Sequence, residues 1–330
     1  MLPPSSPGAR PSMSRPRALF ALLCLCAGAC NPELGLAIGP DASSSSLDCE
    51  EPEIPASGDA GIGDAGIDDG GVPGAHPVVI VSIDGLRADA VALAPADTII
   101  SLACRGAYSM DAQTILPSTT LPAHASMVSG YTAEQHGLLH DYMKADCYIE
   151  VPTVFGLAEE AGLRAVIVVG KQKLVQLAPP GTCDEFLWIS AGDAAVVDAA
   201  IGAIEDGFDI LFVHLPEVDY AGHTSGWMSV EYLAQVRAAD GEVARLVAAL
   251  PAGTTVIVTA DHGGHGTKHS EGTAEDRTIP WIIAGPGVRQ GTEIGAEVSV
   301  MDTAATAAFA LGFALEPDAV GRPVDEAFAP

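Results

Sequence analysis

Five short apolar runs constrain most strongly what this chain can fold into. None of them alternates polar and apolar residues, a pattern typical of strands that are buried on both faces of a parallel sheet. Segments with apolar residues at helical spacing lie between the runs, as expected when helices connect parallel strands. The sequence therefore predicts an α/β fold with a mostly parallel central sheet flanked by helices. The predicted strands are residues 78–83, 165–169, 210–213, 255–260 and 280–283, and the clearest helices are residues 154–161, 231–250 and 302–311.

The first 30 residues combine arginine with an apolar run and contain no acidic residue. Arg15 and Arg17 precede the apolar residues 18–29, an arrangement typical of a secretory signal peptide rather than a spanning helix. The small residues before Cys30 resemble a bacterial lipobox, in which the cysteine is lipidated and becomes the mature N-terminus. An ordinary signal peptide is the alternative. We predict an exported lipoprotein, periplasmic or on the cell surface, that contacts the membrane only through its lipid.

Residues 31–76 contain ten acidic residues, no lysine or arginine, and many glycine and serine residues. A segment of this composition cannot bury enough apolar area to offset the entropy of ordering its chain. We therefore expect a disordered tether that precedes the folded domain. This divides the chain into a signal peptide with the lipobox (1–30), an acidic linker (31–76) and a folded domain (77–330).

The overall charge is strongly acidic, with 15 lysine and arginine residues against 43 aspartate and glutamate residues and a net charge of −28. Such a chain repels the phosphates of nucleic acids, so it is not expected to bind nucleic acid as a scaffold. No apolar run reaches the roughly 18–20 residues that a spanning helix needs. An anionic substrate would require a local positive centre, which bound metal ions can supply.

Four cysteines follow the signal region and the lipobox, and four cysteines allow three complete pairings. We expect Cys147 to pair with Cys183, because both lie in loop-like stretches and an exported protein meets an oxidising environment. The other two are Cys49 and Cys104. None has the spacing of a zinc ribbon, so a structural zinc site of that type is not supported.

Metal-ligating residue types follow three of the predicted strands, close to where each strand ends. Ligands bind outside the carboxyl ends of the strands in open α/β sheets, so these side chains are expected to converge. Aspartate and histidine ligands without cysteine suit zinc or manganese, and this set is large enough for two ions. A two-metal site is typical of enzymes that displace a group at phosphorus. The candidates are Asp84, Asp219, His223, Asp261 and His262, with His265 and His269 following shortly after.

A candidate nucleophile lies in residues 117–130, where several hydroxyl side chains stand in a proline-containing turn before a predicted helix. A hydroxyl at a helix N-terminus lies beside free N–H groups that can bind phosphate. A threonine that merely caps the helix is the alternative.

Taken together, these motifs resemble those of the alkaline phosphatase superfamily, and most closely those of its type I phosphodiesterase/nucleotide pyrophosphatase branch. The matching stretches are residues 82–87, 117–130, 217–223 and 259–264, and they occur in the order of the family. The resemblance implies that Thr120, with Thr119 as the alternative in register, is a nucleophile that forms a phospho-threonine. A threonine at this place argues against a sulfatase, whose nucleophile is made from cysteine or serine.

The resemblance also implies two divalent metal ions, zinc with manganese as the alternative. One ion would be bound by Asp84, Thr120, Asp261 and His262. The other would be bound by Asp219, His223 and a later histidine, which we assign to His269, with His265 as the alternative.

The candidate substrate-binding residues are Asp141 and Lys171. Nucleotide pyrophosphatases carry an asparagine that binds a phosphate oxygen near the position of Asp141, whereas Lys171 follows a strand and offers a positive charge. We expect a hydrolase that cleaves phosphodiester, pyrophosphate or monoester bonds in a small substrate. The alternatives are a phosphonate hydrolase or a mutase-like enzyme of the same superfamily, and a surface lipoprotein that binds without catalysis.

Overall fold

The computed structural model describes residues 47, 49 and 76–329. The predicted signal peptide, the lipidation of Cys30 and the linker as a whole lie outside the described residues and stay predictions. A search of the described residues finds no helix with the length and apolar character that crossing a membrane requires.

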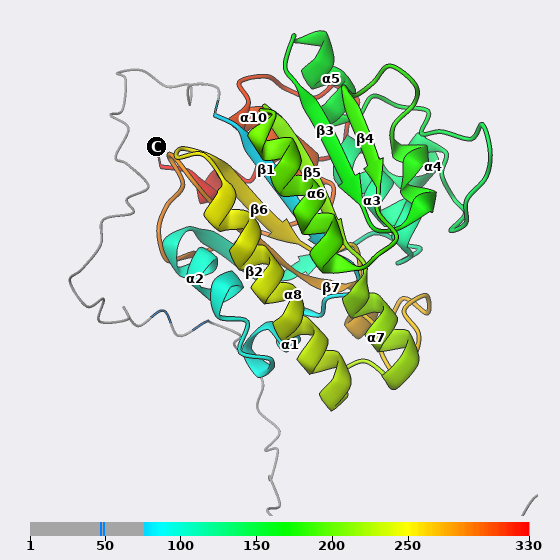
Figure 1. Ribbon diagram of the computed structural model, residues 1–330, viewed down its shortest axis with the longest axis vertical. Helices are drawn as coiled ribbons and strands as arrows, with labels where there is room; N and C mark the ends of the chain where they lie inside the picture. The colour runs from blue at the N-terminus through cyan, green and yellow to red at the C-terminus, as the bar shows by residue number, and fades with distance from the viewer. Residues whose placement is uncertain (1–46, 48, 50–75, 330) are drawn as a thin grey trace, which may run out of the picture. The chain divides into compact units, whose positions relative to one another are not determined.

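The central element is a sheet of eight strands in the order β4-β3-β5-β1-β6-β7-β2-β8 (Figure 1). Each paired neighbour is parallel except β7, which runs antiparallel to both β6 and β2. The predicted fold class, a mostly parallel sheet flanked by helices, is confirmed. The strands are β1 (Val78–Ile83), β2 (Ala107–Gln113), β3 (Ala165–Val169), β4 (Glu185–Trp188), β5 (Ile210–Leu215), β6 (Thr255–Thr259), β7 (Thr278–Ala284) and β8 (Thr292–Glu293).

The helices form two layers around this sheet. Helices α2, α6 and α8 pack together and cross in front of the sheet in Figure 1, whereas α3, α5 and α10 pack together behind it. The predicted helices correspond to α5, α8 and α10. The α-helices are α1 (Ala88–Leu93), α2 (Asp97–Arg105), α3 (Thr120–Ser129), α4 (Ala133–His136), α5 (Val154–Glu160), α6 (Asp193–Glu205), α7 (Glu217–Ser225), α8 (Val230–Ala249), α9 (Ala274–Arg277) and α10 (Asp302–Ala310), and the 3₁₀ helices are η1 (Gln172–Leu177) and η2 (Asp325–Ala327).

The core lies along the middle strands, where β5, β1 and β6 are neighbours. Every residue of these three strands is buried, because helices cover both faces of the sheet. The registers pair Ile83 of β1 with Leu215 of β5, and Ser82 of β1 with Thr259 of β6. The carboxyl ends of the three strands therefore lie side by side, and the residues that follow them meet at one edge.

The disulfide prediction is wrong. Cys49 is bonded to Cys104 in α2, with their Cα atoms 5.3 Å apart, while Cys147 and Cys183 are free and partly buried. Pairing depends on which backbones approach each other in the folded chain, and a loop-like sequence context does not report that distance. The bond ties the chain at Cys49 to the folded domain.

Candidate metal centre

Three neighbouring strands deliver acidic and histidine side chains to one edge of the sheet. Asp84 follows β1 directly, Asp219 lies in the first turns of α7 just after β5, and Asp261 and His262 follow β6. All four side chains are buried, with at most 2% of their surface exposed. The convergence expected from the sequence is thus realised by the parallel order β5-β1-β6.

The first cluster consists of Asp84, Asp261 and His262, and we call it the strand-end half of the centre. One ligand atom from each residue lies within 4.8 Å of the others. The Nε2 atom of His262 is 3.5 Å from Asp84 Oδ1 and 3.3 Å from Asp261 Oδ2.

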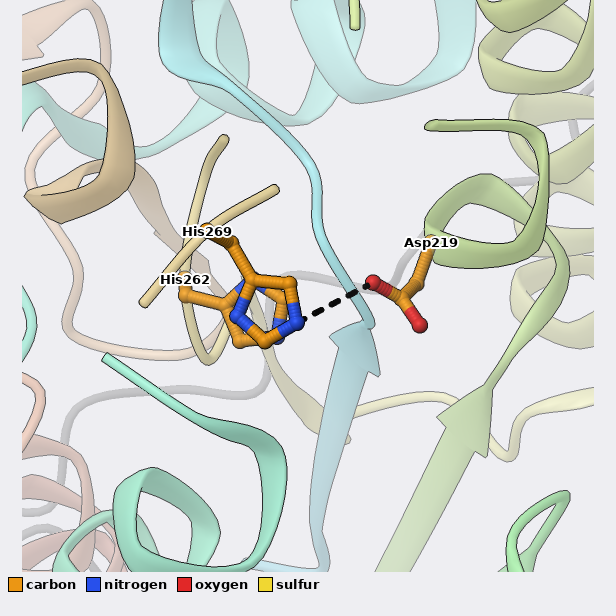
Figure 2. Close-up of side chains that lie close together, drawn as sticks. All are labelled: Asp219, His262 and His269. Atoms are coloured by element: carbon orange, nitrogen blue, oxygen red, sulfur yellow. Dashed lines mark ion pairs between the residues drawn. The ribbon is translucent and has the colours of Figure 1, made fainter. Parts of the chain in front are cut away.

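The second cluster contains Asp219 and His269, with His262 shared between the two clusters (Figure 2). The Nε2 atom of His269 is 4.0 Å from Asp219 Oδ1, and its ring stacks on that of His262 at 3.8 Å. His223 lies next to this group, with its Nε2 3.4 Å from Asp219 Oδ1 and 44% of its side chain exposed. We call Asp219, His223 and His269 the helix-loop half.

Each of the three histidines is held in the tautomer that a metal ligand needs. The Nδ1 atoms of His223, His262 and His269 lie 2.8–3.0 Å from the carbonyl oxygens of Thr267, Gly263 and Ser118, respectively, so each Nδ1–H donates to the backbone. The lone pair of each Nε2 therefore faces the carboxylates. Burial and the neighbouring His262 lower the pKa of His269 to about 4, so its imidazole is neutral at pH 7.

The inner atoms of the centre are buried without hydrogen bonds. Among the described residues, no partner is present for Asp84 Oδ1, Asp219 Oδ1, Asp261 Oδ2 or His262 Nε2. Lone pairs that face one another in a buried place repel, and leaving such atoms unpaired is costly. Divalent cations bound by the two clusters would satisfy these atoms, so the residues fit a metal centre with oxygen and nitrogen donors.

His265 is turned away from this centre. Its Nδ1 lies 2.7 Å from Asp276 Oδ1 and its Nε2 lies 3.2 Å from Glu271 Oε2. Of the two histidines considered for the last ligand, the structure places His269 beside Asp219 and gives His265 other partners.

Thr120 is the first residue of α3 and is 1% exposed, while Thr119 occupies the N-cap position before it. The helix start is fixed from behind by His124, whose Nδ1–H donates to the Thr120 carbonyl over 2.7 Å. The Nε2 of His124 accepts a 2.8 Å hydrogen bond from Ser82 in β1. The hydroxyl of Thr120 lies 3.4 Å from Lys171 Nζ, which also contacts Asp84 of the strand-end half. It stands at a helix N-terminus, where free N–H groups can bind phosphoryl oxygens.

Two family models match separate parts of the folded domain. Residues 78–173 match the family type I phosphodiesterase / nucleotide pyrophosphatase, and residues 189–315 match the metalloenzyme superfamily. A phosphopentomutase of Chelativorans sp. (strain BNC1) is 33% identical over 164 residues, which are 48% of this chain and 37% of that relative. The chain thus spans well under half of this curated relative.

Two solved structures share the fold. Human ectonucleotide pyrophosphatase / phosphodiesterase 5 superposes with a TM-score of 0.64 at 14% identity, over 77% of this chain and 100% of that one. A phosphonate monoester hydrolase from Silicibacter pomeroyi superposes with a TM-score of 0.60 at 16% identity, over 77% of each chain. The two family matches follow one another along the folded domain in the order of the sequence motifs. The resemblance to the alkaline phosphatase superfamily, and to its type I phosphodiesterase/nucleotide pyrophosphatase branch, is thus confirmed.

The two substrate-binding residues predicted from the sequence are Lys171 and Asp141. The Nζ atom of Lys171 lies 2.7 Å from Asp84 Oδ2 and 2.6 Å from Asp219 Oδ2. Asp141 lies at the start of α3, where its Oδ1 accepts from the Leu121 N–H over 2.9 Å and from Lys173 Nζ over 2.7 Å. Lys171 thus contacts two candidate ligands, whereas Asp141 contacts the residue that follows Thr120 at the start of α3. The contact of either residue with substrate stays a prediction.

The two buried aspartates of the strand-end half have different electrostatic environments. Burial alone would raise the pKa of Asp84, but the Lys171 ammonium and the hydrogen bond from His214 hold it well below its usual value. Burial and the negative charge of Asp84 raise the pKa of Asp261 well above its usual value. Lys171 contacts Asp84 directly but lowers the pKa of Asp261 only from a greater distance, and a bound cation would give Asp261 a positive charge in contact.

Sequence reasoning missed His214, which lies behind the centre in β5. The side chain is buried, and its Nδ1 accepts from the Gly170 N–H over 3.2 Å while its Nε2–H donates to Asp84 Oδ2 over 2.8 Å. The available signal was a histidine inside an apolar run that reads as a buried strand. A histidine in such a place needs two polar partners, which here are a metal-ligand candidate and the turn before Lys171.

A pocket of about 430 Å³ opens beside Lys171. Two exposed aromatic side chains stand in its wall, Trp188 at the end of β4 and Tyr220 in α7. The Lys171 Nζ lies 5.3 Å from the centre of the Tyr220 ring, so one cation faces both the pocket and the carboxylates. Its lining residues are Gly170, Lys171, Gln172, Lys173, Trp188, Ser190, Gly192, Pro216 and Tyr220.

Proposed function

We propose that the protein is a two-metal phosphoesterase that hydrolyses phosphate esters through a phospho-threonine at Thr120. The observation that carries this proposal is the set of unpaired inner atoms of Asp84, Asp219, Asp261 and His262 beside a buried threonine at a helix N-terminus. Zinc ions, or manganese ions, bound by the two halves would withdraw electron density from the Thr120 hydroxyl and from the phosphoryl oxygens.

Different residues would attack the phosphorus and bind the phosphoryl oxygens. The Thr120 oxygen, having lost its proton, forms a bond to phosphorus while the bond to the leaving oxygen breaks on the opposite side. Water then cleaves the phospho-threonine and releases phosphate or a monoester. We assign the binding of phosphoryl oxygens to the Leu121 N–H at the start of α3 and to the Lys173 ammonium. Their shared contact with the Asp141 carboxylate supports this, because it shows that both can donate to one oxyanion.

The organic part of the substrate is assigned to the pocket beside Lys171. Its two exposed aromatic rings, Trp188 and Tyr220, offer apolar faces, and Lys173 supplies positive charge for a phosphate group. This supports an ester with a sizeable substituent, in agreement with the diesterase or pyrophosphatase branch.

Export and lipid anchoring at Cys30 are part of the proposal. The Cys49–Cys104 disulfide supports export, because disulfides persist in oxidising compartments and are rare in the cytosol. The expected partner is a small phosphoester.

A mutase is the second candidate, favoured by the 33% identity to a phosphopentomutase. In that case the phosphoryl group on Thr120 would pass to another hydroxyl of a bound sugar phosphate, and no free phosphate would appear. A phosphonate hydrolase is a variant of the first candidate with the same attacking group.

The test uses the purified protein with bis-p-nitrophenyl phosphate, p-nitrophenyl phosphate and an aryl phosphonate monoester, each with chelator and with zinc or manganese added back. Faster cleavage of the diester supports the phosphodiesterase, and faster cleavage of the monoester assigns a phosphatase at the same site. Incubation with a pentose 1-phosphate, followed by detection of pentose 5-phosphate and free phosphate, separates the mutase from the hydrolases. A protein that binds no metal would overturn the proposal.

A second readout looks for the intermediate. Acid quench during turnover, followed by mass spectrometry, should find phosphate on Thr120. The variant Trp188→Ala should raise KM for the bulky diester more than for the monoester, because only the diester fills the aromatic pocket.

A further inference from the structure

Lys171 has an unusual position for a lysine in an active site. Its side chain is only 10% exposed, and its Nζ lies within hydrogen-bond distance of groups from three separate elements. The partners are Asp84 Oδ2 after β1 at 2.7 Å, Asp219 Oδ2 in α7 at 2.6 Å and Thr120 Oγ1 in α3 at 3.4 Å. An ammonium group has three protons, so these contacts use its full capacity.

In Asp84 and in Asp219, one carboxylate oxygen contacts Lys171 and the other points into the centre. The outer oxygen, Oδ2, contacts Lys171 in both Asp84 and Asp219. The inner oxygen, Oδ1, has no hydrogen-bond partner among the described residues and faces histidine Nε2 atoms in both. One cation therefore holds one carboxylate from each half and leaves its other oxygen free for an ion.

The backbone that carries Lys171 is itself fixed to both halves. The preceding Gly170 donates its N–H to His214, and His214 donates to the same Oδ2 of Asp84 that Lys171 contacts. A side chain at Gly170 would lie 2.4 Å from the ring of Pro216, so only glycine allows the turn to approach the start of α7, which carries Asp219. The position of the ammonium is thus determined by the same elements that carry the ligands.

We propose that Lys171 is a positioning residue that braces the two halves of the metal centre, by holding the outer oxygens of Asp84 and Asp219 so that their inner oxygens face the two ions. This inference uses from the proposed function only that the centre binds two metal ions. The ligand class is a pair of divalent cations, and the role of Lys171 is toward the ligands rather than the substrate.

If Lys171 instead competed with the metal ions, its removal would change the metal affinity in the opposite direction. An ammonium that competed with the ions for the carboxylates would weaken metal binding, and its removal would tighten it. A brace improves binding, because it prevents the carboxylates from rotating, and removing an outer partner of a metal ligand costs roughly 10–100-fold in affinity. The geometry favours the brace, since the oxygens that face the histidines are not the oxygens that Lys171 contacts.

The test measures metal binding in the absence of substrate. Zinc affinity and stoichiometry are determined by competition with a chromophoric chelator and by elemental analysis for the wild type, Lys171→Met and Lys173→Met. The matched control is Lys173, a neighbouring lysine whose partner is Asp141 and none of the candidate ligands. Lys171→Met should bind both ions roughly 10–100-fold more weakly, while Lys173→Met stays within about twofold of the wild type, well inside the effect expected for an outer partner.

Lys171→Arg, which keeps the positive charge and can bridge two carboxylates, should recover part of the lost affinity. Unchanged or tighter binding by Lys171→Met, or a loss at one ion only, would overturn the brace. Should Lys171→Met fail to fold by circular dichroism, Lys171→Gln with manganese and electron paramagnetic resonance gives the second test: a brace predicts weaker magnetic coupling between the two ions, and unchanged coupling contradicts it.

The outcomes separate this inference from the proposed function. Metal affinity that depends on Lys171 in a protein that cleaves no phosphoester would keep the brace and remove the phosphoesterase. Phosphoester cleavage with metal affinity independent of Lys171 would do the reverse.

Discussion

The two halves of the metal centre are built in different ways. In the strand-end half, Asp84 is the first residue after β1 and Asp261 is the second after β6, and both side chains are fully buried. In the helix-loop half, Asp219 and His223 lie on the short helix α7, and His269 lies in the stretch between β6 and α9. His223 leaves 44% of its side chain exposed.

This difference teaches how the centre obtains its rigidity. The sheet fixes the strand-end ligands through backbone hydrogen bonds to neighbours on both sides. The two histidines of the helix-loop half are each held to the backbone by one hydrogen bond, such as the 2.8 Å bond from His269 Nδ1–H to the Ser118 carbonyl. We expect the first half to be preformed and the second to be ordered in part by the metal itself.

The largest effect is expected at Thr120, which stands beside the strand-end half without belonging to the sheet. Thr120→Ala should lower kcat by roughly a thousandfold or more, because it removes the attacking oxygen. It should keep both ions and its thermal stability, since the aspartates and histidines are untouched. Steady-state kinetics with metal analysis checks this, with Thr119→Ala as the matched control. A Thr120→Ala variant with near-normal turnover would move the nucleophile elsewhere.

The next effect compares one ligand from each half. Asp261→Ala should reduce zinc affinity by more than the roughly 10–100-fold associated with outer-shell partners, because a fully buried ligand is lost. His223→Ala should cost roughly tenfold, because water can replace an exposed imidazole. Calorimetric titration of both variants gives the order, and a larger loss at His223 would contradict the division into a preformed and a metal-ordered half.

Removing the metal should increase the difference in backbone mobility between the two halves. With a chelator, hydrogen exchange should speed up in α7 and in residues 262–277, and change little in β1 and β6, because the strands keep their sheet hydrogen bonds. The expected difference is read by mass spectrometry of the same peptides with and without zinc. Equal protection in both regions would mean that the helix-loop half is as rigid as the sheet.

The smallest effect concerns Asp193, which supports the start of α7. Its Oδ1 accepts from the Glu217 N–H, and the Glu217 side chain accepts from the Asp193 N–H, both over 3.1 Å. Burial and the nearby Glu217 charge raise the pKa of Asp193 to about 7. The folded state therefore keeps a proton that the unfolded chain has lost above about pH 4, so this group's contribution to stability falls as pH rises from about 4 to about 7.

Asp193→Asn removes that charge and keeps the oxygen that accepts from Glu217. The variant should gain Tm relative to the wild type at pH 8 by about 2 °C or more, and gain less at pH 5. Thermal unfolding at the two pH values measures the difference. The same gain at both pH values would show that Asp193 does not titrate between them.

Much of the fold could be predicted because its strongest elements have clear patterns. The apolar runs of β1, β3, β5 and β6 and the helices α5, α8 and α10 all follow from residue spacing. The strands β2, β4 and β8 were missed because they lack long β-branched runs. The antiparallel direction of β7 was also hidden, since a short apolar strand reads the same in both directions.

The sequence by itself determined which residue types follow which strands, and this was enough to collect Asp84, Asp219, Asp261 and His262 at one edge once the strands were taken as parallel. The sequence did not determine which side chains contact or bond to one another. The Cys49–Cys104 bond, the tautomers of the histidines, the buried His214 and the contacts of Lys171 with two carboxylates all join residues far apart in the chain. Spacing reports which side chains can share a local element, whereas distances between elements are decided by the packing of the sheet and its helices, and only the tertiary structure contains them.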